Sequence, residues 1–195
     1  MVDSKHSIIG CHYDGYGVAV TVAESSNEGD YHVLKEWYQL SPAVPLRVAN
    51  ECDEIFYYEA LKPDRKIEIF INDSALLQQS LLKMPSITRN SIKVASIKKD
   101  DAFTVINSLL AEQKISSDSQ VLGLEKELDL FDPSATHPNH RVYALFNAVG
   151  QAEFNRLTIP ESFHHRVSGS IRRIRLLGDP IRSCHTFLSD SDWDD

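Results

Sequence analysis

The order of strand-like and helix-like segments is the feature that most limits what this chain can fold into. Three β-rich runs come first, at about 7–14, 16–24 and 31–40, and turn signals at Asp14-Gly15 and at 27–30 join them. Gly, Asn and Asp tolerate the positive φ of tight hairpins, whereas β-branched and aromatic residues favour strands. The sequence therefore predicts an antiparallel three-stranded meander at the start of the chain.

After the meander, helices and strands alternate. Apolar residues recur three or four positions apart between 46 and 61, which predicts an amphipathic helix. A strand at 66–72, a helix at about 74–83, a strand at 91–97 and a helix from about 100 to 110 follow. Strands separated by helices pair in parallel through right-handed crossovers.

The last segments complete a single α/β domain. A short extended piece near 114–116 leads to a helix at about 119–130, and a final clear helix begins after Pro138-Asn139 and runs to about 154. We expect an α/β sandwich around a mixed five-stranded sheet, in which the antiparallel meander is followed by βαβ units and helices flank the sheet.

Composition limits the classes of function. The net charge of -8 argues against a surface that is basic all round, so any contact with nucleic acid needs a local basic patch. The three scattered cysteines, Cys11, Cys52 and Cys184, fit reduced thiols better than a disulfide framework. No apolar stretch approaches the roughly 20 residues of a membrane span, so we expect a soluble, cytoplasmic protein with no membrane partner.

The character of the sequence changes at about residue 158. We expect 1–157 to form the main domain and 158–195 an appendage with a basic patch and an acidic tail. Clustered guanidinium groups bind phosphates bidentately, which makes four arginines candidates for contacting nucleic acid. They are Arg166, Arg172, Arg173 and Arg175. A salt-bridged surface strand, or a partner for the acidic tail, is an equally good explanation of this cluster.

Two aspartates end apolar strand-like runs. Asp14 follows 7–13 and Asp73 follows 66–72. If these strands are neighbours in one sheet, the two carboxylates meet at one edge, where oxygen ligands could hold Mg²⁺. Each aspartate also has a structural explanation, because Asp14 suits a hairpin turn and Asp73 suits a helix N-cap.

With these residues the chain resembles the ribonuclease H-like superfamily, most closely the nuclease domain of phage terminase large subunits. The resemblance covers about 7–155. Asp14 matches the first catalytic position and Asp73 matches the second. The segment 138–145 is similar to the terminase segment in which an aspartate precedes an Ala-Leu pair, and His140 or Asn139 stands where the family carries its third acid.

The resemblance implies a DNA endonuclease that uses two Mg²⁺ or Mn²⁺ ions during viral DNA packaging, in the host cytoplasm if the protein is viral. Asp14, Asp73 and His140 would be both catalytic residues and metal ligands, and Glu127 could supply a missing carboxylate. DNA would be cut with little sequence specificity. No Walker-type phosphate-binding loop occurs in the chain, which fits either an isolated nuclease-like domain or a stand-alone relative without a motor. An ATPase motor or other packaging proteins are the partners that the resemblance implies.

Two alternatives from other classes remain open. One is a catalytically inactive ribonuclease H-like module that binds or assembles within a viral or nucleoprotein complex. The other is an unrelated α/β binding domain, which predicts that Asp14 and Asp73 lie apart. The distance between these two carboxylates, and the presence of a third donor group near them, distinguishes the three hypotheses.

Overall fold

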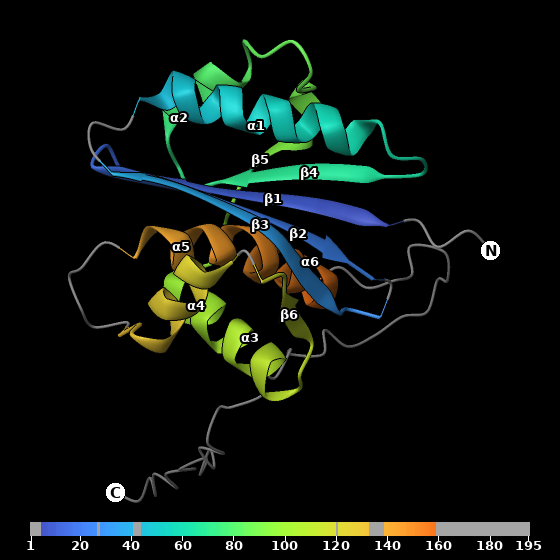
Figure 1. Ribbon diagram of the computed structural model, residues 1–195, viewed down its shortest axis with the longest axis vertical. Helices are drawn as coiled ribbons and strands as arrows, with labels where there is room; N and C mark the ends of the chain where they lie inside the picture. Colours follow the sequence, from blue (N-terminus) through green and yellow to red (C-terminus); the bar gives the residue numbers. More distant parts are fainter. Residues whose placement is uncertain (1–4, 27, 41–43, 120, 133–138, 159–195) are drawn as a thin grey trace, which may run out of the picture.

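The central sheet of this protein has six strands in the order β5-β4-β1-β2-β3-β6. The computed structural model describes residues 5–26, 28–40, 44–119, 121–132 and 139–158. Helices cover both faces of the sheet (Figure 1). The predicted appendage with Arg166, Arg172, Arg173 and Arg175 lies outside the described residues, as does Pro138.

The predicted meander is confirmed. Strands β1 (His6–Tyr13), β2 (Gly17–Ser25) and β3 (Tyr31–Leu40) pair antiparallel in sequence order. A two-sided sheet needs side chains that alternate between its faces. Accordingly Ile8 belongs to the apolar core on one face and Ile9 to the core on the other.

The parallel half of the sheet brings the ends of two strands together. Strand β4 (Lys66–Ile71) pairs in parallel with β1, and β5 (Ile92–Val94) pairs in parallel with β4. Cys11 lies opposite Ile71, so both strands end at the same edge of the sheet. This arrangement is the one that the two strand-ending aspartates predict.

The sheet has one strand more than the five predicted. The short extended piece becomes β6 (Ile115–Ser117), which pairs in parallel with the start of β3. The Tyr31 amide also donates a hydrogen bond to the Lys114 carbonyl at 2.7 Å. A three-residue strand carries too little periodicity to be recognised from sequence, because its pairing is decided by the edge of β3 that it meets.

Two layers of helices enclose the sheet (Figure 1). One face is covered by α1 (Pro45–Ala60) and α2 (Ala75–Leu81), and a 3₁₀ turn (Arg89–Ser91) precedes β5. The other face is covered by α3 (Lys99–Ala111), α4 (Leu122–Asp129), α5 (His140–Leu145) and α6 (Gln151–Thr158), with a π-helical turn (Phe146–Gly150) between the last two. None of these helices is long and apolar enough to cross a membrane.

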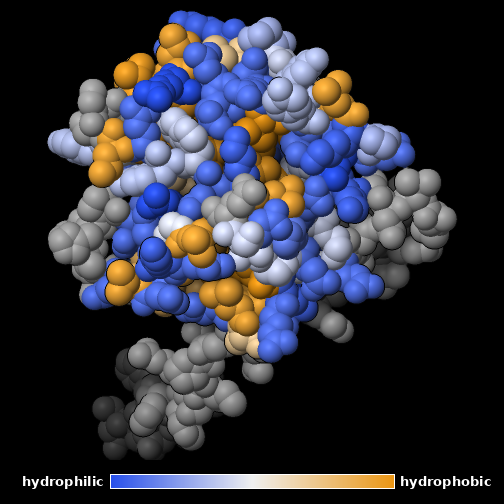
Figure 2. All heavy atoms as spheres, in the orientation of Figure 1, coloured by the Kyte–Doolittle hydropathy of each residue, from blue (hydrophilic) through white to orange (hydrophobic). Residues whose placement is uncertain are grey.

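The surface seen in Figure 2 is mostly hydrophilic, with hydrophobic residues in separate small groups. Large apolar side chains that are exposed include Leu46, Leu61 and Leu76 on or beside α1 and α2. Singly exposed apolar side chains are normal on water-facing surfaces.

Close packing of α5 on the sheet depends on Gly10. A Cβ atom built on Gly10 would lie 2.1 Å from the Ala144 carbonyl oxygen and 2.6 Å from the Ala148 Cβ. Only glycine leaves room for this approach of helix backbone to strand. Gly10 thereby fixes the position of α5, which carries His140.

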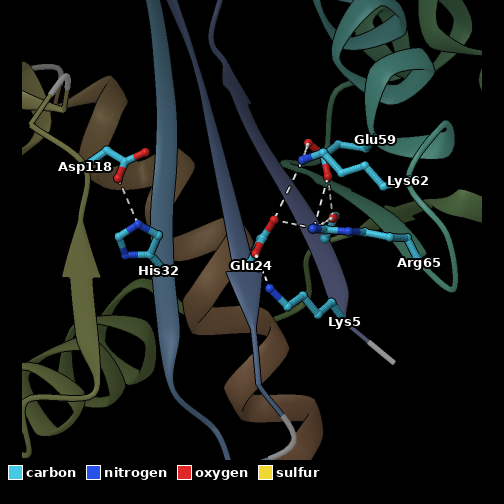
Figure 3. A network of polar contacts seen from close by, with 8 residues as sticks. Lys5, Glu24, His32, Glu59, Lys62, Arg65 and Asp118 are labelled. Carbon is cyan, nitrogen blue, oxygen red and sulfur yellow. Dashed lines mark hydrogen bonds and ion pairs between the residues drawn. The ribbon is translucent and has the colours of Figure 1, made fainter. Parts of the chain in front are cut away.

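A buried ionic network joins α1 to the strand ends opposite the aspartates (Figure 3). Ser7 Oγ donates to Glu59 Oε2 at 2.7 Å, and the Arg65 guanidinium donates to Ser7 Oγ at 3.0 Å. Arg65 Nη1 also lies 3.3 Å from Glu59 Oε2 and pairs with Glu24. These contacts fix α1, β1, β2 and the start of β4 relative to one another.

Glu68 gives this fold an expected acid sensitivity. Its carboxylate is almost fully buried and contacts His6 Nε2 at 2.8 Å, Lys66 Nζ at 3.1 Å and Lys93. Burial alone would raise the pKa of Glu68, but the hydrogen bonds from His6 and Lys93, the charge of His6 and the hydrogen bond from Lys66 hold it well below the ordinary value of 4.5. A carboxylate with a lowered pKa stabilises the fold above its ordinary pKa, and this stabilisation is lost as pH falls.

We therefore expect Glu68→Gln to lower the free energy of unfolding at pH 7 by about 2 kcal/mol, as for loss of hydrogen bonds to a charged group. The difference from the wild type should shrink as pH falls below 4.5. Urea unfolding at pH 7, 5 and 3.5 measures it, with Glu112→Gln as the control because Glu112 forms an exposed pair with Lys114. A difference that stays constant with pH would contradict this origin of the stabilisation.

Candidate functional site

Three potential metal ligands meet where β1 ends. They are His12 near the end of β1, Asp14 at the start of the turn to β2, and His140 as the first residue of α5. One donor atom of each residue lies within 4.8 Å of the donor atoms of the other two. The fold therefore brings together two residues of one strand end and one from a helix 126 positions later than Asp14.

Asp14 is held by the backbone of its own turn. Its Oδ1 accepts hydrogen bonds from the amides of Tyr16 at 2.9 Å and Gly17 at 3.0 Å, and Gly15 has a φ of 91°. Its Oδ2 lies 3.7 Å from His140 Nδ1. Burial alone would raise the pKa of Asp14, but the two amides and the two imidazoles lower it, so the carboxylate is ionised at neutral pH. The turn residue and the candidate ligand are thus the same residue.

His140 is buried without a hydrogen-bond partner. Its side chain is 0% exposed, and neither ring nitrogen has a hydrogen-bond partner among the described residues. A Cβ atom on Gly17 would lie 2.3 Å from His140 Nε2, so the absence of a side chain there makes room for the ring. Buried polar atoms without partners are costly and need an explanation. A bound ion would supply one.

His12 is the member of this group that the sequence reasoning missed. Its ring lies 4.9 Å from the ring of Tyr143 and 5.5 Å from that of His140. Burial and the charge of His140 lower the pKa of His12 to about 4, against the opposing effect of Asp14. A neutral imidazole keeps a lone pair for a ligand. The available signal was the spacing, because residues two apart at a strand end share one face of the sheet.

Asp73 lies outside this group. It is exposed in the turn between β4 and α2, and Ser74 rather than Asp73 caps α2 by accepting a hydrogen bond from the Leu77 amide at 3.3 Å. The preceding residue, Asn72, faces β1: its Oδ1 accepts from the Tyr13 amide at 2.9 Å and its Nδ2 donates to the Tyr13 carbonyl at 2.7 Å. The side chain bonded across the two strand ends is therefore an amide and not a carboxylate.

Glu127, the predicted substitute for a missing acid, is bound to Arg141. Glu127 Oε2 accepts from the Arg141 amide at 3.0 Å and Oε1 from its guanidinium at 2.7 Å. The same guanidinium lies 3.1 Å from Glu36 Oε2 and stacks over the ring of Tyr38 at 4.0 Å. These contacts hold the Glu127 carboxylate at the junction of α4 with α5.

A positive charge lies beside Tyr143, the aromatic residue that contacts His12. Lys99, the first residue of α3, places its Nζ 5.5 Å from the ring centre of Tyr143 and 5.8 Å from that of Phe131. Tyr143 in turn contacts His12. Tyr143 therefore contacts both the Lys99 ammonium group and the His12 ring.

The donor set does not fit a pair of Mg²⁺ ions. Mg²⁺ is bound mainly through carboxylate, phosphate and water oxygens. Here one carboxylate is grouped with two imidazoles, and one oxygen of that carboxylate already accepts two amide hydrogen bonds. Nitrogen and oxygen donors in these proportions fit a single transition-metal ion instead.

Comparison with solved structures places the fold. The large terminase from a thermophilic bacteriophage is similar with a TM-score of 0.59 and 13% identity, over 75% of this chain and 39% of that protein. The nuclease domain of the large terminase g2p from bacteriophage SPP1, with bound Mn, has a TM-score of 0.55 and 16% identity over 75% of this chain and 86% of that one. The human cytomegalovirus terminase nuclease domain has a TM-score of 0.51 and 11% identity, covering 75% and 83%.

Sequence comparisons add no closer relative: no family model matches the chain, and no curated protein matches it. The chain spans about two fifths of the length of the large terminase from the thermophilic bacteriophage. The mixed sheet and the helices on both its faces are nevertheless those of the terminase nuclease domains. The predicted resemblance is confirmed at the level of the fold: this chain has the ribonuclease H-like fold of the terminase nuclease domains.

Proposed function

We propose that this chain is a metal-dependent DNA endonuclease domain of the terminase type. The observation that carries the proposal is the convergence of His12, Asp14 and His140 at the end of β1. A structural neighbour, the SPP1 nuclease domain, was solved with bound Mn. A divalent cation held at such a site polarises a phosphoryl oxygen and activates water for attack.

The residues around this position have separable roles in the proposal. Asp14, with its lowered pKa, supplies the negative charge that a cation needs, and His12 and His140 supply imidazole nitrogens. Lys99 beside Tyr143 provides positive charge for a DNA phosphate. The arginines of the predicted basic patch, Arg166, Arg172, Arg173 and Arg175, would bind phosphates of the DNA backbone. An ATPase motor is the proposed partner.

A catalytically inactive binding or assembly module is the second candidate. The observation that favours it is the shortage of carboxylates, since Asp73 lies outside the three-ligand group and the strand end beside Tyr13 carries Asn72. In this role the domain would bind DNA or packaging proteins in a viral or nucleoprotein complex without cutting. The third hypothesis, an α/β domain of another fold, is not favoured because the fold is that of the terminase nuclease domains, but Asp73 lies outside the three-ligand group as that hypothesis predicts.

Nicking of supercoiled plasmid distinguishes the two candidates. We expect Mn²⁺-dependent nicking that stops on chelation and falls at least about 100-fold in Asp14→Asn and in His140→Ala, as expected when metal ligands are lost. His32→Gln is the matched control, because His32 also contacts a carboxylate, Asp118 at 2.9 Å, but at the β3–β6 end of the sheet (Figure 3). Its nicking rate should equal that of the wild type.

The outcomes of this assay separate the candidates. DNA binding without nicking in Mn²⁺ or Mg²⁺ would sink the endonuclease proposal and support the inactive module. Nicking that persists unchanged in Asp14→Asn would show that cleavage comes from another site or from a contaminant. Absence of both DNA binding and nicking would argue against a DNA substrate for this domain.

A further inference from the structure

We infer that His12, Asp14 and His140 bind one transition-metal ion, such as Mn²⁺, Co²⁺ or Zn²⁺, and discriminate against Mg²⁺. The inference rests on the site of the proposed function and states its metal, which can be measured without DNA. Two ions held by Asp14, Asp73 and His140 are what the terminase resemblance predicts. The described residues point to a different centre, with two nitrogen donors and one oxygen donor.

The donor chemistry sets the selectivity. Two imidazoles and one carboxylate are the ligand set of many single-ion transition-metal sites, whereas Mg²⁺ binds imidazole poorly and prefers oxygen. One carboxylate and two neutral imidazoles leave a charge of +1 around a divalent ion. A second divalent ion at the same place would raise this to +3, with no further carboxylate of the group to offset it.

His140 supplies independent support for a bound ion. Its imidazole is 0% exposed, both ring nitrogens lack hydrogen-bond partners among the described residues, and Nδ1 faces Asp14 Oδ2 at 3.7 Å. An apolar residue at this position would avoid the cost of burying unpaired nitrogens. Coordination of a metal through Nδ1 gives the buried ring a favourable interaction.

The residues around the three ligands hold them in place. The amides of Tyr16 and Gly17 occupy Asp14 Oδ1, which leaves Oδ2 directed at His140 as a single donor atom. The missing side chain of Gly17 accommodates the His140 ring, and Tyr143 packs against His12. Such contacts orient the residues that bind a metal and raise its affinity.

The spacing suits an ion after a modest contraction. Metal bonds of about 2.1 Å put ligand atoms roughly 3.0–3.4 Å apart, whereas the three donors here lie within 4.8 Å of one another. Asp14 can close part of this gap, because its side chain is 37% exposed. The same exposure opens the site to water or to a phosphate oxygen as a further ligand.

Titration calorimetry of the untagged, chelator-treated full chain tests the inference. We expect one Mn²⁺, Co²⁺ or Zn²⁺ ion per chain and binding of Mg²⁺ that is at least about 100-fold weaker. Co²⁺ should give visible absorption bands that report nitrogen and oxygen coordination. His12→Gln, Asp14→Asn and His140→Ala should each weaken Mn²⁺ binding by at least about 10-fold.

Three further variants control the design. His32→Gln should bind Mn²⁺ as the wild type does, since His32 bonds to Ser116 and Asp118 at another end of the sheet. Asp73→Asn decides between the two metal sites: unchanged affinity supports the three-ligand centre, and lost affinity would overturn it in favour of an Asp14–Asp73 site. Gly17→Ala should weaken binding although it removes no donor atom, because its Cβ would displace the His140 ring.

Folding and function are kept separate from metal binding. Circular dichroism and thermal unfolding identify any variant that fails to fold, and Asp14→Asn is the safest variant because Asp14 is partly exposed. Two ions per chain, or Mg²⁺ affinity equal to that for Mn²⁺, would overturn the inference. One Mn²⁺ per chain without plasmid nicking would uphold the inference and sink the endonuclease proposal.

Discussion

Gly10→Ala is expected to lower the free energy of unfolding by about 3 kcal/mol, at the upper end of the usual cost of overpacking a core. The added Cβ would meet the Ala144 carbonyl oxygen at 2.1 Å and the Ala148 amide nitrogen at 2.6 Å. These are backbone atoms of α5 and the following turn, so the clash can be relieved only by moving the helix from the sheet. Because α5 carries His140, metal binding should weaken as well.

Gly150→Ala is the matched control for this substitution. Its Cβ would lie 3.5 Å from the Ala102 Cβ, an ordinary contact, and the helical position favours alanine over glycine. We expect Gly150→Ala to raise the free energy of unfolding by up to about 1 kcal/mol, whereas Gly10→Ala should lower it. Urea unfolding at pH 7 measures the free energy of unfolding of both variants. Equal stability of Gly10→Ala and the wild type would show that the packing of α5 on β1 does not need a glycine at position 10.

Arg65→Ala is expected to cost about 3 kcal/mol, the lower end of the range for breaking one partner out of a buried ion pair. The Arg65 side chain is 10% exposed and contacts Ser7, Glu24 and Glu59. Burial alone would raise the pKa of Glu24, but Arg65, Lys5 and Lys62 lower it. Without the guanidinium, the Glu59 carboxylate would remain buried with less opposing charge.

A comparison with Lys62 isolates the effect of burial. Lys62 also pairs with Glu59, at 2.6 Å, but the Lys62 side chain is 41% exposed. Lys62→Ala should therefore lower the free energy of unfolding by at most about 1 kcal/mol. The double variant with Arg65→Ala and Glu59→Gln should lose less free energy of unfolding than the two single variants lose together, because it removes both buried charges. Strict additivity in urea unfolding would contradict a coupled network.

Much of the fold could be predicted because it depends on local patterns. Tight turns at Asp14-Gly15 and alternating or helical spacing of apolar residues are properties of neighbouring positions, and the meander, α1, β4 and α3 occur where these patterns predict them. The shorter β5 and the additional β6 were not predictable in this way. Their extents depend on the hydrogen-bonding edge that a neighbouring strand presents.

The candidate site could be predicted only in part. The resemblance singled out Asp14 and His140, and in the structure Asp14 Oδ2 lies 3.7 Å from His140 Nδ1. Asp73 and Glu127 lie outside the three-ligand group. Asp73 as a catalytic residue and metal ligand stays a prediction, which the Asp73→Asn variant tests. The basic patch with Arg166, Arg172, Arg173 and Arg175 also stays a prediction, since it lies outside the described residues.

Local patterns in the sequence specify the order of strands and helices, the turn at Asp14 and the positions of two aspartates after apolar strand-like runs, because backbone preferences and hydrophobic spacing act over short distances. Which side chains meet depends instead on the packing of elements that are distant in the chain, including the pairing of β1 with β4. The glycine at position 10 lets α5 approach β1, Gly17 makes room for the His140 ring, and Asn72 takes the position between the strand ends. These contacts join residues far apart in the chain, and their geometry depends on how the helix packs on the sheet.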